Sequence, residues 1–286
     1  MISIEPDFNS IARTCDWIEL YILCDSEKLS KSKFRRILTN YGNDVSDTFI
    51  ADTFAELHRR QKMMGEDSVF MLAADDIIKR SRYGWEDVPE YVMCLIFSLQ
   101  GVKKIKGDED GTKLFERIGR HVISAYLDGE AIVLGFPNPD GKNLNEQLID
   151  FATQSNEIKS KDRVPANTDK DKGVDIIGWK PHFDGRENQV ILLIQAAAGY
   201  HWDLKKPISE NAWRDFFMWS APINKGIIIA GTLDEINFRK AKDDYDLVFD
   251  RIRIFISLYK RNLKIDNVLR ELVKGWCTKE LNIEAA

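Results

Sequence analysis

The chain has 286 residues, of which 44% are hydrophobic and 30% are charged, and its formal net charge is -5. This composition is typical of a folded globular protein and excludes a collagen-like, low-complexity or intrinsically disordered chain. The length exceeds the usual size of one compact core, so two domains are expected, although a single larger α/β domain stays open. The acidic balance excludes nucleic-acid binding through bulk basicity, so such a function needs a local basic patch or metal ions.

Neither a membrane span nor a secretory signal is expected. The apolar runs Val190–Ile194 and Ile227–Ala230 are much shorter than the roughly 20 residues that cross a bilayer. Residues 1–7 lack the basic and apolar regions of a signal peptide, which favours a cytoplasmic location. The four cysteines form no C-x-x-C pair, which indicates reduced core thiols rather than a zinc site.

The N-terminal part of the chain has the spacing of helices. Apolar residues recur at helical intervals in Trp17–Cys24, Phe49–Leu57 and Tyr91–Leu99, and the last of these follows Pro89 and is apolar enough to predict a buried helix. The polar stretch Lys103–Gly111 then predicts a linker or long turn. We therefore expect a mainly α-helical domain at residues 1–105 and a second domain at residues 106–286.

From residue 112 onward, helical and strand patterns alternate. Helices are predicted at Thr112–Leu127, Asn143–Gln154, Ser209–Trp219 and Tyr245–Tyr259. Strands are predicted at Ala131–Phe136, Val174–Trp179, Gln189–Ala197 and Gly226–Gly231. This order predicts an α/β fold, with a mixed central sheet flanked by helices.

One pair of strands carries polar residues suited to metal chemistry. Asp175 stands at the start of one predicted strand, and Gln195 follows five aliphatic residues in the next. Alternation along the strands places these two side chains on the same face, so we expect them to be neighbours. A carboxylate and an amide oxygen, with the Ala196 carbonyl and Glu116 of the preceding helix, form an all-oxygen set that suits Mg²⁺.

These residues resemble the PD-(D/E)XK nuclease superfamily, in the branch that has Gln in place of the acidic residue of the second motif. The resemblance covers residues 112–260 and rests on a helix with Glu116, then Gly173–Ile177, and then the hairpin strand ending in Gln195. It implies a restriction-endonuclease-like fold that hydrolyses DNA with Mg²⁺ or Mn²⁺. Asp175 would be the principal metal ligand, Gln195 the second polar residue of the motif and Glu116 the acidic residue of the first helix. The resemblance also implies a role in bacterial restriction or phage defence, with DNA as partner.

The family's lysine is absent from its usual place, two residues after the Gln, where this chain has Ala197. A lysine there stabilises the attacking water and the charge that develops on the phosphate. Lys205 is the first candidate for a relocated amine, and Lys172 is the second. Without a substitute, the site would bind metal but hydrolyse poorly.

Other interpretations stay open. Asp175 also suits a turn, Glu116 a solvated helix face and Lys205 an ordinary surface position. The segment Lys28–Arg36 is rich in basic residues and suits either a solvated face or phosphate contact. The whole protein has three candidate classes: a nuclease whose N-terminal domain recruits DNA or a protein partner, in a possible homo-oligomer; a catalytically inactive scaffold or binding subunit; and a different α/β enzyme.

Overall fold

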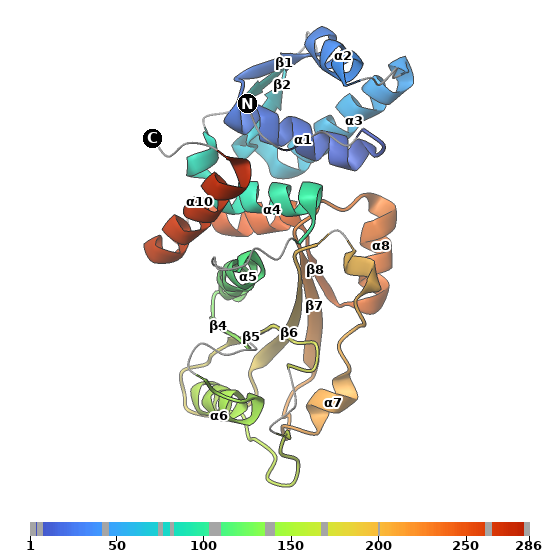
Figure 1. Cartoon of the computed structure of the whole chain (residues 1–286). Coiled ribbons are helices and arrows are strands. Elements are labelled where there is room, and N and C mark those ends of the chain that lie inside the picture. Colours follow the sequence, from blue (N-terminus) through green and yellow to red (C-terminus); the bar gives the residue numbers. More distant parts are fainter. Residues whose placement is uncertain are drawn as a thin grey trace.

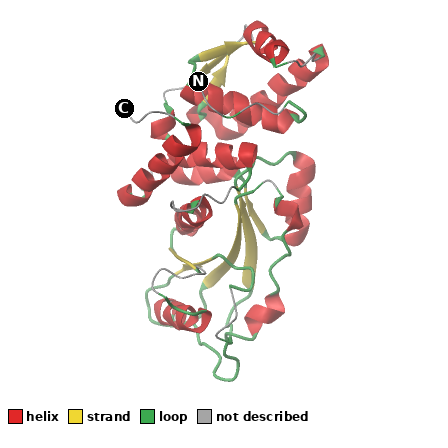
Figure 2. Cartoon of the chain, viewed as in Figure 1, coloured by secondary structure: helices red, strands yellow, loops and turns green. Residues whose placement is uncertain are grey.

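The computed structural model describes residues 4, 8–41, 46–73, 77–80, 83–102, 110–134, 141–166, 171–199, 201–260 and 265–282. These residues form a mixed α/β structure with a three-stranded and a five-stranded sheet (Figures 1 and 2). Among the described helices, none is both long and apolar enough to cross a membrane.

Helices dominate the N-terminal part, as predicted. They are α1 (Ile11–Cys24), α2 (Lys31–Asn40), α3 (Asp47–Met64) and α4 (Pro89–Gln100). The sequence did not predict the small antiparallel sheet beside them, formed by β1 (Lys28–Ser30), β2 (Phe70–Leu72) and β3 (Ile77–Arg80) in the order β1-β3-β2. These strands have three or four residues each, too few to show a clear alternation of apolar and polar side chains.

The five-stranded sheet has the order β4-β5-β6-β7-β8 and is mixed, as predicted. Its strands are β4 (Glu130–Val133), β5 (Ile176–Lys180), β6 (Val190–Ala197), β7 (Ile223–Ile229) and β8 (Leu247–Phe249). The pairs β4·β5 and β5·β6 are antiparallel, whereas β6·β7 and β7·β8 are parallel. The predicted strand Ala131–Phe136 corresponds to β4, and its last two residues lie outside the described residues.

Helices cover both faces of this sheet (Figure 1). They are α5 (Gly111–Leu127), α6 (Leu144–Ser155), α7 (Glu210–Arg214), α8 (Glu235–Asp244) and α9 (Arg251–Phe255), which continues into a π-helical turn at Ile256–Lys260. Helix α10 (Asn267–Leu281) packs on α4 and α5 instead. One face packs against α5 through Ile176, Ile194 and Ile228. The other face packs against α6 through Ile177 and Leu193, and against α8 through Ile227 and Ile229.

Two glycines bring α5 close to the sheet. A Cβ atom added to Gly119 of α5 would lie 2.6 Å from Ile176 Cδ1, and one added to Gly178 of β5 would lie 2.4 Å from Ile123 Cγ2. Both distances are shorter than a normal van der Waals contact. The short helix-to-sheet distance therefore depends on these two positions, and it places the first turns of α5 near the start of β5.

Two predicted helices were wrong in part. The segment Tyr245–Tyr259 begins with the strand β8, because Leu247–Phe249 pairs in parallel with β7, and the helix starts only after Asp250. The Asp250 side chain accepts a hydrogen bond from Arg253 N, which caps that helix. The segment Ser209–Trp219 is helical only at Glu210–Arg214, after which the chain extends so that Met218 N donates to Ile158 O.

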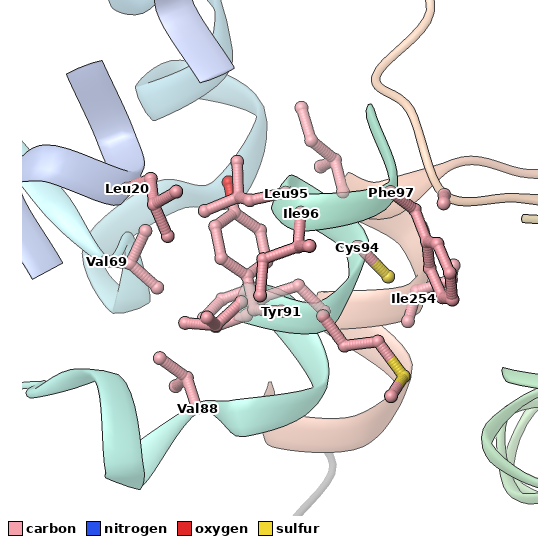
Figure 3. Packing of buried hydrophobic residues seen from close by; sticks show 14 of the residues in the cluster. Leu20, Val69, Val88, Tyr91, Cys94, Leu95, Ile96, Phe97 and Ile254 are labelled. Carbon is pink, nitrogen blue, oxygen red and sulfur yellow. The ribbon is translucent and has the colours of Figure 1, made fainter. Parts of the chain in front are cut away.

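The helix predicted after Pro89 is confirmed as α4, and it is buried from Pro89 to Leu99. It contacts α1, α9 and α10, so segments from both ends of the chain surround it. Figure 3 shows this packing, with Leu20 of α1 and Ile254 of α9 among the apolar side chains around α4. The proposed boundary near residue 105 stays a prediction, and residues 103–109 lie outside the described ones.

A cluster of buried charges also joins α1 and α3 to α9. Arg60 Nη1 donates to Asp16 Oδ1 at 2.5 Å and to Glu19 Oε1 at 2.8 Å, and Arg251 Nη2 donates to the same Asp16 oxygen at 2.5 Å. Burial opposes ionisation of Asp16, but the Arg251 and Arg60 guanidiniums hold its pKa well below the usual range. All four side chains are almost inaccessible to solvent, so this cluster is an internal ion network.

Candidate functional site

A tight turn places Asp175 at the start of β5. Lys172 and Gly173 both have positive φ angles, 51° and 80°, and Val174 N donates to Asp171 O at 2.9 Å. The Asp171 side chain also accepts a hydrogen bond from Gly173 N at 2.9 Å. An aspartate followed by a glycine in the left-handed region is a typical sequence for such a turn. Asp175 was predicted near the start of the strand Val174–Trp179, and it lies directly before β5.

The Asp175 side chain reaches across to β6. Asp175 N donates to Ile194 O at 2.9 Å, which continues the β5·β6 pairing, and Asp175 Oδ2 accepts a hydrogen bond from Ala196 N at 2.6 Å. Burial raises the pKa of the Asp175 carboxyl above its usual range, although the Lys205 ammonium and the Ala196 N–H act in the opposite direction. Asp175 and Ala196 are therefore in direct contact.

Gln195 lies on the sheet face expected from the alternation. Its neighbours on that face, Leu193 and Ala197, belong to two different apolar clusters, so Gln195 is a polar interruption between them. The side chain is buried, and its Oε1 accepts a hydrogen bond from Tyr245 Oη at 2.6 Å. Burial raises the pKa of Tyr245 to about 12, and the charges of Asp244 and Asp175 add to this effect.

Lys205 contacts one of the predicted metal ligands directly. Its Nζ donates a hydrogen bond to the Ala196 carbonyl oxygen, and its positive charge lowers the pKa of Asp175. Lys205 follows the short helical turn Trp202–Leu204 after β6, where the backbone is extended. Lys172, the second candidate, has an exposed side chain in the turn before Asp175.

Glu116 approaches the same region from α5. It is 7% exposed, and its two carboxylate oxygens each lie 2.9 Å from Lys113 Nζ. Burial and, to a smaller extent, the charge of Asp175 raise the pKa of the Glu116 carboxyl to about 7, against the opposing effect of Lys113. The carboxyl of Glu116 is thus close enough to Asp175 for the two charges to interact.

The structure therefore brings together residues from the start of β5, the end of β6, helix α5 and the segment after β6. Asp175, Gln195 and Ala196 lie together at the β5·β6 pair. Lys205 donates a hydrogen bond to the Ala196 carbonyl, and Glu116 belongs to the adjacent helix α5. A pocket of about 340 Å³ opens beside Lys205, between Ala197 and the end of α4 at Gln100. A bound molecule would have access to Lys205 from this pocket.

Two residues of this region were missed by the sequence reasoning. Lys113 was not recognised as a cation for the site, although it stands three residues before Glu116, a spacing at which helical side chains interact. Tyr245 was placed inside a predicted helix, whereas it follows α8 and faces Gln195. Its contact with Gln195 joins residues 50 positions apart, so no local pattern indicates it.

The carboxylate oxygens of Asp175 and Glu116 and the carbonyl oxygen of Ala196 are ligands that suit a hard divalent cation. Among the described side chains, no group of three or more His, Cys, Asp or Glu residues is placed to hold a metal ion. A site here would therefore combine the two carboxylates of Asp175 and Glu116 with the Ala196 carbonyl, and Mg²⁺ accepts such a partial set because it keeps several waters. A cation between the carboxylates would also relieve the repulsion that raises the pKa of Glu116. These oxygen ligands are of the kind that Mg²⁺ and Mn²⁺ prefer.

The basic segment Lys28–Arg36 lies far from these residues, on β1 and α2 at the opposite end of the molecule from α6 (Figure 1). Three of its basic side chains have interaction partners within the protein. Lys31 Nζ lies 5.1 Å from the centre of the Phe54 ring, Lys33 Nζ lies 5.4 Å from that of Tyr21, and Arg35 pairs with Asp47.

Comparisons with known proteins do not assign a family. No family model matches the sequence. Over 163 residues the chain is 26% identical to the inducible nitric oxide synthase of Gallus gallus, and the match covers 54% of this chain and 14% of that protein. The Bos taurus enzyme of the same name is 25% identical over 166 residues, covering 56% of this chain and 14% of that protein. The chain thus spans 14% of the length of these relatives.

Among solved structures, the restriction endonuclease FokI is similar at a TM-score of 0.22 with 9% sequence identity, over 91% of this chain and 46% of that one. This value is too low to establish a shared fold.

Proposed function

We propose that the chain is a Mg²⁺-dependent DNA endonuclease whose active site is formed by Asp175, Glu116, the Ala196 carbonyl, Gln195 and Lys205. The observation that carries the proposal is the proximity of these residues: Asp175 accepts from Ala196 N, Lys205 donates to the Ala196 carbonyl, and the charges of Glu116 and Asp175 interact. The proposed fold is the restriction-endonuclease-like one, and the proposed setting is restriction or phage defence, which rests on the sequence resemblance.

Each side chain has a distinct task in this proposal. Asp175, Glu116 and the Ala196 carbonyl would hold the ion, which supplies an activated water and neutralises charge on the scissile phosphate. Lys205 would stabilise the developing negative charge, in the role of the lysine that the family has where this chain has Ala197. Its contact with the Ala196 carbonyl supports this assignment over Lys172.

The same contact also supports a second candidate. Lys205 donates to the carbonyl that would ligate the ion and its charge lowers the pKa of Asp175, so its ammonium equally suits a structural replacement for a lost metal. In that case the protein is an inactive scaffold or binding subunit of a larger complex. The N-terminal helices would serve either function by contacting DNA or a protein partner.

Cleavage of a supercoiled plasmid distinguishes the two. The nuclease proposal predicts nicked or linear product from the wild type in Mg²⁺, none in EDTA, and none from Asp175→Ala in either buffer. Absence of product from the wild type in both Mg²⁺ and Mn²⁺ would favour the scaffold. Equal cleavage by Asp175→Ala would show that the site has been assigned to the wrong residues.

Three lysine variants then identify the catalytic amine. Lys205→Ala is expected to slow cleavage by about 100-fold or more, because an electrostatic group at the reacting phosphate is lost. Lys172→Ala is expected to have a small effect, and Lys113→Ala an intermediate one through Glu116. Unchanged rates in Lys205→Ala would reject the relocation of the lysine.

A further inference from the structure

The hydrogen bond between Tyr245 and Gln195 determines which end of the Gln195 amide faces the site. Both side chains are buried, Tyr245 at 3% and Gln195 at 7% exposure. A buried tyrosine hydroxyl that keeps its proton needs an acceptor, and the Gln195 amide oxygen, at 2.6 Å, provides one. With the amide turned over, Gln195 Nε2 would donate to the hydroxyl oxygen, and the hydroxyl proton would lose the acceptor that it has here. The oxygen of Gln195 therefore points to Tyr245.

The amide nitrogen points the other way. A Cβ atom added to Gly173 would lie 3.4 Å from Gln195 Nε2, so this nitrogen faces the turn that positions Asp175. In the described part of the chain, Nε2 donates to no acceptor, and it is not among the fully buried atoms that lack a partner. A bound molecule can therefore reach it.

We infer that Gln195 acts as a hydrogen-bond donor to a substrate phosphate and not as a metal ligand, and that Tyr245 is the positioning residue that fixes it in this orientation. This inference rests on the proposed nuclease function and assigns the roles of two residues within it. An amide N–H repels a cation and suits a phosphate oxygen, and Lys205 provides a second donor close to Asp175.

A purely structural role for Gln195 explains the geometry less well. Its position interrupts an apolar sheet face between Leu193 and Ala197, where an aliphatic residue would join the two clusters. The amide oxygen has a protein partner in Tyr245, whereas the accessible amide nitrogen is left as a donor for a bound molecule. Such a residue is typical of a site that completes its hydrogen bonds on binding a ligand.

Two separate binding measurements test the inference. The first is the anisotropy of a fluorescent duplex DNA titrated with protein in EDTA, and the second is calorimetry of Mg²⁺ binding without DNA. The variants are Gln195→Ala and Tyr245→Phe. Tyr126→Phe is the matched control, since this tyrosine of α5 is 43% exposed and the substitution keeps the ring that packs against Phe249. Thermal unfolding of each variant checks that it is folded.

We expect Gln195→Ala to weaken duplex binding by about tenfold and Tyr245→Phe by about threefold, which corresponds to losing one charge-assisted hydrogen bond or its orientation. Mg²⁺ affinity should be unchanged in both. A tenfold loss of Mg²⁺ affinity in Gln195→Ala, with duplex binding intact, would overturn the donor role. Wild-type duplex affinity in Tyr245→Phe would overturn the positioning role.

If the protein is not a nuclease, the same two binding measurements give a different result. A wild type that binds neither duplex nor Mg²⁺ removes the nuclease proposal together with the donor role. A wild type that binds both, with duplex affinity unchanged in Gln195→Ala, overturns the donor role alone and leaves the nuclease proposal standing.

Discussion

Burial raises the pKa of the Glu116 carboxyl to about 7 from an ordinary value of 4.5, so the folded protein holds this proton more tightly than the unfolded chain does. The stabilising contribution of the protonated carboxyl is fully present below about pH 4.5 and is lost as the pH rises through about 7. In the absence of metal, the ionised carboxylate at pH 8 therefore destabilises the fold. A buried carboxylate that destabilises the fold when it is ionised is typical of a residue that binds a cation.

Replacing Glu116 by Gln should stabilise the metal-free protein at pH 8, because the neutral amide avoids burial of a charge. The gain in unfolding free energy is expected to be on the order of 2–3 kcal/mol at pH 8 and near zero at pH 4.5. Thermal unfolding in EDTA at both pH values measures it, with the exposed Glu86→Gln as control. A lower Tm for Glu116→Gln at pH 8 would mean that the ion pair with Lys113 outweighs the burial.

At the scale of elements, the ion network fixes α9 against α1 and α3. Arg251 is fully buried, contacts Asp16 and Glu19, and lies over the Tyr91 ring at 5.3 Å. Breaking a buried pair leaves an uncompensated charge in a medium that solvates it poorly. The network therefore makes the position of α9, and of β8 directly before it, dependent on the N-terminal helices.

Arg251→Met should lower the free energy of unfolding by about 3–5 kcal/mol, because Asp16 and Glu19 would keep only Arg60 as a buried counterion. Urea denaturation followed by circular dichroism measures the loss. Arg214→Met is the control, since that side chain is 64% exposed and its pairing with Glu210 should contribute less than about 1 kcal/mol. Similar stabilities for the two variants would contradict the importance assigned to the network.

The sequence predicted the elements that show a local pattern of apolar residues. It missed those that form only through contacts with distant parts of the chain. Alternation located β5 and β6 and therefore placed Asp175 and Gln195 together, because the register of a hairpin follows from its two strands. The strand β8 was missed because its three residues form a strand only by pairing with β7. Asp16 and Arg251, 235 positions apart, carry no local sign that they are buried together.

At the scale of the whole molecule, one hydrophobic cluster extends from α1 to α10 and includes the sheet face under α5. Helix α10 returns to pack on α4 and α5, so both ends of the chain contribute to the support of Glu116 (Figure 1). The site lies on the β5·β6 pair, and the pocket beside Lys205 reaches the end of α4.

The single-turnover rate of duplex DNA cleavage in Mg²⁺ tests the central claim most directly, when wild type is compared with Asp175→Asn. The amide keeps the size of the side chain but loses the charge that would hold the ion, so the rate is expected to fall by about 100-fold or more. Asp184→Asn, an exposed residue of the loop between β5 and β6, is the control and should cleave at the wild-type rate. Cleavage by Asp175→Asn at the wild-type rate would contradict the account.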